Sequence, residues 1–317
     1  MRVIAAEDIA PVLSYDSLVE ALREAFCADV IVPVRQHYTI PRPGEDATLL
    51  LMPAWMAVGA AFVGCKVVTV FPDNAALGRP ALYGSYLLLS GKTGEPLATL
   101  DGRVLTAWRT GAASALAATF LARTDARHLV MIGAGALAPH LIAAHAAVRP
   151  IGRVTLWNRT RRRAEELAAD LGRRGLTIAV ADDLESAVRT ADIISCATLA
   201  REPLVRGAWL KPGAHVDLVG GFTPDMREAD DDAVRRARVY VDTRAGACEE
   251  AGDIVDPIRR GIIGESDVRG DLFDLCRGNA TGRQSASEIT LFKSVGSALE
   301  DLAAAMLVWR RLGGSVP

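Results

Sequence analysis

The 317-residue sequence has few aromatic side chains, few cysteines and almost no net charge. Aromatic residues make up only 5% of the chain, which argues against a surface on which nucleic-acid bases stack. The 36 basic and 38 acidic residues nearly cancel, so no electrostatic case exists for nucleic acid or an anionic membrane as a partner. The five cysteines are odd in number and lack metal-ligand spacing, which disfavours a disulfide framework and a metal site.

A membrane-spanning run is also missing. The apolar stretch from Pro53 to Cys65 ends at Lys66 and is shorter than the roughly 20 residues of a spanning helix. Glu7 and Asp8 occupy the region where a signal peptide would be apolar. We therefore expect a soluble, cytoplasmic protein whose partner is a small molecule.

Half of the residues are hydrophobic, and residues 128–244 alternate short apolar strands with helices. Strands that are apolar throughout are typical of a parallel sheet buried on both faces, so the pattern predicts a doubly wound α/β domain of the Rossmann type. The expected strands are Leu129–Ile132, Val154–Trp157, Thr177–Val180, Ile193–Ala197, His215–Val219 and Val239–Asp242. The expected helices are Pro139–Val148, Arg161–Arg173, Asp183–Thr190 and Arg227–Ala237.

The first 105 residues follow a different pattern. A helix over Asp16–Ala28 precedes strand-like runs separated by turns rich in glycine and proline, which predicts a mostly antiparallel sheet. These runs are 36–40, 48–52, 63–70, 84–90 and 96–101. Helices are expected over Thr106–Arg123 and over Ile289–Leu312, the latter from its apolar i, i+3/i+4 spacing. We predict an α+β substrate-binding and dimerisation domain formed by 1–118 with 297–317, and an NAD(P)-binding Rossmann domain at 119–296.

A glycine-rich turn follows the first strand of the predicted Rossmann domain. The segment His128-Leu-Val-Met-Ile-Gly-Ala-Gly-Ala-Leu-Ala138 indicates a strand, a Gly-x-Gly-x-x-Ala turn and a helix. Gly133 allows the bend, Gly135 lets a pyrophosphate approach the backbone, and Ala138 lets the helix pack close to the strand. The phosphates would lie at a helix N-terminus, which favours negative charge. This context predicts a dinucleotide site that includes Gly133, Gly135 and Ala136.

The end of the second strand bears on the choice of cofactor. NAD-preferring sites usually have an acidic residue here that binds the ribose 2′-hydroxyl, whereas this chain has Asn158 and Arg159. A neutral residue followed by arginine removes repulsion of a 2′-phosphate and adds a planar donor for it. We expect NADP(H) to be preferred, with NAD possible, and contacts from Asn158, Arg159 and Thr160. The run Arg161–Arg163 indicates either a nearby anion or a solvated helix face.

Charged residues lie inside apolar surroundings in the N-terminal region: Lys66 at the end of an apolar run, Arg109, and Arg35 with His37. With the turn Val219-Gly-Gly-Phe-Thr-Pro-Asp-Met-Arg-Glu228 and the tail from Glu288 to Asp301, these segments resemble the ornithine cyclodeaminase/mu-crystallin family. The resemblance covers nearly the whole chain. It implies a Rossmann-domain protein, usually a homodimer, that acts on amino acids and cyclic imino acids with a nicotinamide cofactor.

The resemblance also implies roles for single residues. Lys66 is expected to be the active-site lysine, because burial beside a cofactor can lower the pKa of an amine until it exchanges a proton near neutral pH. Arg109 is expected to hold the substrate carboxylate, with Arg35 as a second contact. The alternatives are a snorkelling edge-strand lysine and surface arginines. The remaining residues expected at the cofactor are Thr110, for which a helix cap is an equal alternative, Thr198, Val219 and Ser294.

Two departures from the ornithine cyclodeaminases favour a simpler reaction. Those enzymes have an aspartate where this chain has Phe222, and an acidic residue in a motif that here reads Leu50-Leu-Met-Pro53. Groups that would address substrate amines are therefore missing. The Phe-Thr-Pro-x-Met-Arg-Glu form of the turn resembles the ketimine reductase branch of the family. That resemblance implies reduction of pyrroline-2-carboxylate or piperideine-2-carboxylate to L-proline or L-pipecolate. Lys66 is the expected acid, and Asp217 is a weaker candidate that more often would be structural. Ornithine cyclodeaminase, an open-chain amino-acid dehydrogenase and an NADPH-binding carrier of the mu-crystallin kind remain alternatives.

Overall fold

The computed structural model describes residues 1–57, 61–173 and 177–316, and it divides into two compact units. The first unit is Met1–Arg109 with Ser297–Pro317, and the second is Thr110–Gly296. The sequence places the first boundary after residue 118, whereas the compact units part nine residues earlier in the same helix. Residues 58–60, within the apolar stretch 53–65, lie outside the described residues.

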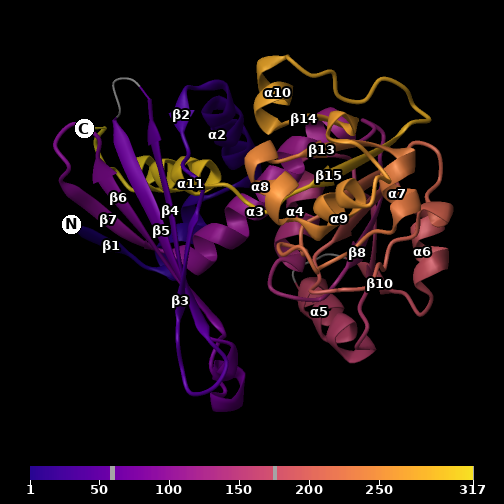
Figure 1. The fold of residues 1–317 in the computed structure, drawn as a ribbon, viewed down its shortest axis with the longest axis horizontal. Coiled ribbons are helices and arrows are strands. Elements are labelled where there is room, and N and C mark those ends of the chain that lie inside the picture. The colour runs from indigo at the N-terminus through magenta and orange to yellow at the C-terminus, as the bar shows by residue number, and fades with distance from the viewer. Residues whose placement is uncertain (58–60, 174–176, 317) are drawn as a thin grey trace. The chain divides into compact units, whose positions relative to one another are not determined.

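The first unit is built on a sheet whose described strands run in the order β1-β7-β6-β5-β4-β2, with β3 also paired to β4 (Figure 1). Every described pairing is antiparallel except that of β1 with β7, as the turn-rich sequence predicts. The strands are β1 Arg2–Ile4, β2 Val30–Ile31, β3 Gln36–Ile40, β4 Ala47–Met56, β5 Phe62–Val70, β6 Leu82–Ser90 and β7 Pro96–Asp101.

Helices cover one face of this sheet. Helix α11 (Ala298–Arg311) packs on α2 (Tyr15–Cys27) and on β4, β5 and β6. The side chain of Ser297 caps α11, whose first turn is acidic and whose last turn is basic, as the helix dipole favours. The other helices are α1 (Ala6–Ile9) and the first turns of α3 (Gly102–Leu121).

Strand alternation gives the sheet two unlike faces. Lys66 and Val68 in β5 are buried, whereas Val67 between them is 36% exposed. Lys66 pairs with Met52 of β4 and Tyr86 of β6, and both of these are buried as well. Because directly paired residues point to the same side, Lys66 belongs to the covered face.

The second unit is a sheet of parallel strands in the order β10-β9-β8-β11-β12-β15-β13-β14 over its described residues. This confirms the predicted doubly wound α/β fold. The strands are β8 His128–Ile132, β9 Arg153–Trp157, β10 Ile178–Val180, β11 Ile193–Cys196, β12 His215–Leu218, β13 Ala237–Val241, β14 Val268–Asp271 and β15 Ile289–Lys293. The helices are α4 Ala138–Val148, α5 Arg161–Arg173, α6 Leu184–Thr190, α7 Asp231–Arg236, α8 Arg244–Glu250, α9 Gly252–Arg259 and α10 Leu272–Arg277.

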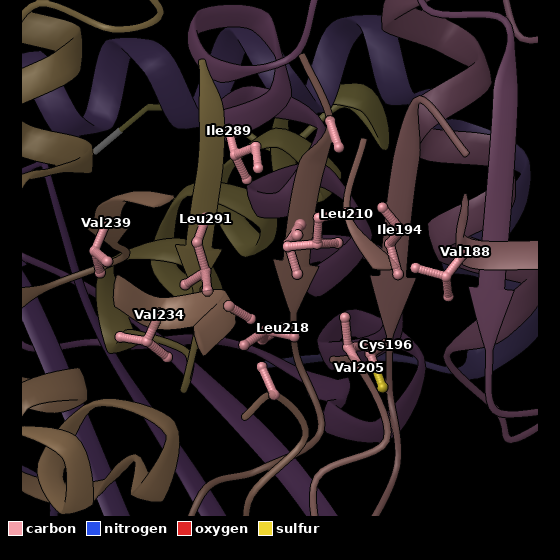
Figure 2. Close-up of a cluster of buried hydrophobic side chains, with 14 of the residues drawn as sticks. Val188, Ile194, Cys196, Val205, Leu210, Leu218, Val234, Val239, Ile289 and Leu291 are labelled. Atoms are coloured by element: carbon pink, nitrogen blue, oxygen red, sulfur yellow. The ribbon is translucent and has the colours of Figure 1, made fainter. Parts of the chain in front are cut away.

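An apolar cluster holds the central strands of this unit against their helices. Figure 2 shows Ile194, Leu218 and Leu291 on three strands of the sheet, with Val188 of α6 and Val234 of α7 packed against them. All five are at most 1% exposed. Burial on both faces explains why these strands read as continuous apolar runs.

The predicted helix over Ile289–Leu312 is wrong in its first third. Ile289–Lys293 forms β15, which lies between β12 and β13 and is buried at every residue. Gly296 then adopts a φ of +84°, and the helix begins only after Ser297. The apolar run at Ile289 has strand length, so the i, i+3/i+4 pattern there arose from two separate buried elements.

Candidate active site

The glycine turn after β8 has the geometry that a bound pyrophosphate requires. Gly133 has a φ of +106°, and a Cβ there would lie 2.6 Å from the carbonyl oxygen of Ala197. A Cβ on Gly135 would meet no described atom within 4 Å, so the backbone there is open. Ala138 is buried where α4 packs against the strand. The turn therefore has the bend, the open backbone and the close helix packing of a Gly-x-Gly-x-x-Ala turn, and its contact with a cofactor stays a prediction.

Asn158 fixes the neighbouring strand end to this turn. Its Oδ1 accepts a hydrogen bond from the backbone N–H of Ala134 at 3.2 Å, and its Nδ2 donates to the carbonyl of Thr160 at 2.9 Å. Both ends of the carboxamide are thus engaged with backbone. Asn158 shapes the turn, and Arg159 is the charged group beside it.

A cavity of about 350 Å³ lies beside the turn in the second unit. It brings together Gly133, Gly135, Asn158, Arg159, Thr160 and Thr198 among the predicted site residues. Ala136, Thr110, Val219 and Ser294 do not line it, and their cofactor contacts stay predictions. Arg163, from the arginine run, also lines it, and the further lining residues that the sequence prediction omitted are Ala134, Trp157, Ala197, Leu199, Ala200 and Leu204.

The run Arg161–Arg163 was expected to be either a solvated helix face or a site near an anion, and its members differ in this respect. Arg161 pairs with Glu165 and Asp182, and Arg162 pairs with Glu166, all largely exposed. These pairs form a solvated helix face of small energetic weight. Arg163 instead lines the cavity next to Arg159.

The two predicted catalytic cations meet two acidic residues in the first unit. Lys66 Nζ lies 2.7 Å from Asp301 Oδ2, and Arg109 donates from Nε to Asp301 Oδ1 at 3.0 Å and from Nη1 to Glu300 Oε2 at 2.7 Å. All four side chains are at most 6% exposed. Lys66 is therefore no snorkelling lysine, because its ammonium group is buried and paired.

Burial sets the protonation of this group. Desolvation and the charge of Arg109 lower the pKa of Lys66 to about 8, and Asp301 opposes this shift. Arg35, half-buried before β3, also lowers it, so its charge reaches Lys66. The three predicted substrate contacts thus form one electrostatic group. A lysine with a pKa near 8 can exchange a proton close to neutral pH.

Helix α3 begins earlier than predicted, which changes the positions of Arg109 and Thr110 within the helix. It starts at Gly102, where Asp101 Oδ1 accepts from the N–H of Val104 at 2.8 Å. Arg109 is therefore a buried residue of the helix interior and no helix-end surface arginine. The alternative of Thr110 as a helix cap is wrong for the same reason.

Asp217, the weaker acid candidate, is fully buried in β12, one residue before its end. Ser114 donates to its Oδ1, while Ser195 and His145 contact its Oδ2. Burial would raise the pKa of this carboxyl, but the contacts with His145 and Ser195 hold it below its ordinary value. A carboxylate in such a network suits a structural role.

The sequence prediction omitted Glu300 and Asp301, the anionic half of the group. The sequence did contain a signal for a helix start at this point. Ser297 is followed three residues later by the acid Glu300, which is the pattern of a capped helix. Their pairing with Lys66 and Arg109 joins positions about two hundred residues apart, which local patterns do not show. His37 is exposed.

The geometry can be compared with known proteins. Residues 2–315 match the model of the ornithine cyclodeaminase/mu-crystallin family. The chain belongs to this family. It is 38% identical to the delta(1)-pyrroline-2-carboxylate reductase of Colwellia psychrerythraea over 98% of this chain and 99% of that one. The predicted enzyme class, an NAD(P)-dependent imine oxidoreductase, is thereby confirmed.

Solved structures agree with this assignment. The delta(1)-pyrroline-2-carboxylate reductase of Thermococcus litoralis, in complex with NADH and L-proline, superposes with a TM-score of 0.92 at 34% identity, covering 98% of this chain and 97% of that one. An archaeal alanine dehydrogenase dimer with bound NAD gives 0.90 at 29% identity, with 99% and 98% covered. A nicotinamide cofactor is therefore supported.

The described part of the chain lacks both a membrane-spanning helix and a metal-binding cluster. None of the helices there is long and apolar enough to cross a membrane. No cluster of histidine, cysteine, aspartate and glutamate within that part of the chain is arranged to hold a metal ion.

The Lys66–Asp301 pair makes a prediction that needs no substrate. Asp301→Asn removes the charge that opposes desolvation, so the pKa of Lys66 should fall below its value of about 8. Reductive ¹³C-methylation of the lysines followed by NMR titration would measure this midpoint. Asp16 is exposed on α2, so the control variant Asp16→Asn should leave the Lys66 midpoint unchanged. An unmoved or raised midpoint in Asp301→Asn would contradict the pairing.

Proposed function

We propose that the chain reduces a cyclic imino acid, pyrroline-2-carboxylate or piperideine-2-carboxylate, to L-proline or L-pipecolate with NADPH. The observation that carries this proposal is a buried set of ion pairs, in which Lys66 pairs with Asp301 and Arg109 pairs with Glu300 and Asp301. It combines a cation for a carboxylate with an amine that exchanges a proton near neutral pH. The similarity to enzymes named for pyrroline-2-carboxylate reduction supports the substrate class.

The residues around the cofactor cavity suit a dinucleotide. The open backbone at Gly135 and the N-terminus of α4 accommodate phosphate, and Arg159 and Arg163 line the same cavity. A bound nicotinamide would supply the hydride that the imine carbon accepts.

The chain's own residues would supply the remaining steps. Arg109 and Arg35 bind the substrate carboxylate and so fix the ring. Lys66, in its ammonium form, donates a proton to the imine nitrogen, which makes the adjacent carbon electrophilic. The amine that forms keeps this proton, and Lys66 is reprotonated from solvent. Phe222, 49% exposed, supplies no acid for the removal of a second amine.

We predict that Lys66→Met lowers kcat/KM for imine reduction by about 10²–10⁴-fold, the usual worth of a positioned acid. Because the acid form of Lys66 exists below its pKa of about 8, the wild-type rate should fall as pH rises through that value. Cofactor oxidation would be followed with both cyclic imines. Lys92→Met, on an exposed turn, should behave as wild type.

Assays with other substrates separate the alternatives. Release of ammonia and proline from L-ornithine with NAD⁺ would instead indicate a cyclodeaminase. Oxidation of NADPH by pyruvate with ammonia would indicate an open-chain dehydrogenase. Full activity of Lys66→Met would refute the acid role.

The preference for NADPH rests on Arg159 and Arg163 beside the neutral Asn158. Arg159→Ala should lower the ratio of kcat/KM for NADPH to that for NADH by about 10–100-fold, the loss of a charge-assisted contact. Arg162→Ala removes an arginine already paired with Glu166 and should leave the ratio unchanged. An unchanged ratio in Arg159→Ala would favour NAD, the form named for the solved relatives.

The open face of the first unit's sheet supports a homodimer. Tyr38, Leu49, Thr69 and Tyr83 are paired in one row across β3, β4, β5 and β6, on the side opposite Lys66. Tyr38 and Tyr83 are about half exposed on this apolar row. A second copy would cover this row, and the similar archaeal alanine dehydrogenase is a dimer.

Sedimentation equilibrium tests the dimer. We expect wild-type protein at twice the chain mass and Val67→Glu shifted towards the monomer, since the new carboxylate would be desolvated in the interface. Lys92→Glu, an acid placed on an exposed turn, should stay dimeric. A wild-type monomer at micromolar concentration would refute the proposal.

A further inference from the structure

A second buried charge group lies in the second unit, apart from the one at Lys66. Glu228, Asp253 and Lys293 are each 0% exposed. Lys293 Nζ lies 3.2 Å from Asp253 Oδ2 and 3.9 Å from Glu228 Oε2. Such burial is costly, and it persists only where the charges are paired and the remaining lone pairs accept hydrogen bonds.

Glu228 accepts four hydrogen bonds, two on each carboxylate oxygen. Oε1 accepts from the backbone N–H of Thr198 at 2.7 Å and from its hydroxyl at 2.8 Å. Oε2 accepts from the N–H groups of Gly220 and Gly221 at 2.8 and 3.4 Å. One side chain thereby joins the loop after β11 to the turn after β12.

These two segments meet at the carboxyl ends of adjacent parallel strands, where ligands of such sheets bind. A Cβ on Gly220 would lie 2.0 Å from the carbonyl oxygen of Thr198, so the two backbones are in direct contact. Thr198 lines the cofactor cavity, and its methyl lies close to Gly133. The position of this cavity wall therefore depends on the link through Glu228.

The rest of the group holds Glu228 in place. Asp253 Oδ1 accepts from the backbone N–H groups of Glu228 and Ala229 at 2.7 and 3.0 Å. Lys293, at the end of β15, supplies the nearby positive charge. Burial raises the pKa of the Glu228 carboxyl, and the charge of Lys293 opposes this shift.

We propose that Glu228 is a positioning residue for the nicotinamide cofactor: its carboxylate clamps Thr198 to Gly220 and so fixes the cavity wall that the cofactor contacts. The inference rests on the proposed binding of a nicotinamide cofactor in this cavity, and it is independent of which imine is reduced. The carboxylate itself is required. A glutamine has one accepting oxygen and would present an NH₂ group to one of the two pairs of donors.

The test is cofactor affinity in the full chain without substrate, measured by quenching of protein fluorescence with NADPH and with NADH. Glu228→Gln should raise Kd for the cofactor by about tenfold, because the loosened wall at Thr198 no longer fits the cofactor. At saturating cofactor, KM for the imino acid should stay within about twofold of wild type, since the clamp acts on the cofactor wall. Glu166→Gln, on the exposed face of α5, is the matched control.

A folded Glu228→Gln with unchanged Kd would overturn the proposal, as would equal losses in Kd and imino-acid KM. If Glu228→Gln does not fold, Thr198→Val and Thr198→Ser decide. Valine removes the hydroxyl that donates to Glu228 and should weaken cofactor binding more than serine, which keeps that hydroxyl. Equal binding by both variants would overturn the clamp. Cofactor binding without imine reduction would refute only the substrate assignment.

Discussion

The first unit depends on a pairing between its two chain segments, in which Lys66 and Arg109 meet Glu300 and Asp301 out of water. Burying either cation alone would cost several kcal/mol, and the same is true of the acids. The pairs offset that cost only when α11 is docked on the sheet. The chain must therefore return to its first unit after completing the second.

This requirement gives the order of elements a physical reason. The chain leaves the first unit along α3 and completes a parallel sheet, whose strand β15 lies between β12 and β13. Only three residues separate Lys293 at the end of β15 from Ser297 at the cap of α11. A helix carrying two buried acids in its first turn thus follows directly from the last strand inserted into the other sheet. The dipole of α11 favours those acids at that end.

Much of the fold could be predicted from the sequence because its signals are local. The Gly-x-Gly-x-x-Ala turn, the apolar strands and the antiparallel region each have a period or a turn that a short segment displays. The helix predicted over Ile289–Leu312 is wrong in part because β15 and α11 share one apolar run. Other helix starts are also displaced: α3 begins at Gly102 after Asp101 and not at Thr106, and the helix predicted over Arg227–Ala237 is confined to Asp231–Arg236.

The candidate site divides in the same way. The cations Lys66 and Arg109 stand out because charge in an apolar run is visible in sequence, and the resemblance gave them roles. Their acidic partners are not recognisable in the sequence, because Ser297, Glu300 and Asp301 have the pattern of an ordinary capped helix start. Partners some two hundred residues apart meet only through sheet register and helix docking, so their identity required the structure.

The charge count of this group bears on what it can bind. Lys66, Arg109 and Arg35 carry three positive charges when Lys66 is protonated, and Glu300 and Asp301 carry two negative charges. One positive charge is left, which a single carboxylate neutralises. Without the two acids, the three cations would lack their buried counter-charges, and the pKa of Lys66 would fall further below its ordinary value. The two acids therefore limit the excess positive charge of this buried group, and Asp301 opposes the lowering of the Lys66 pKa.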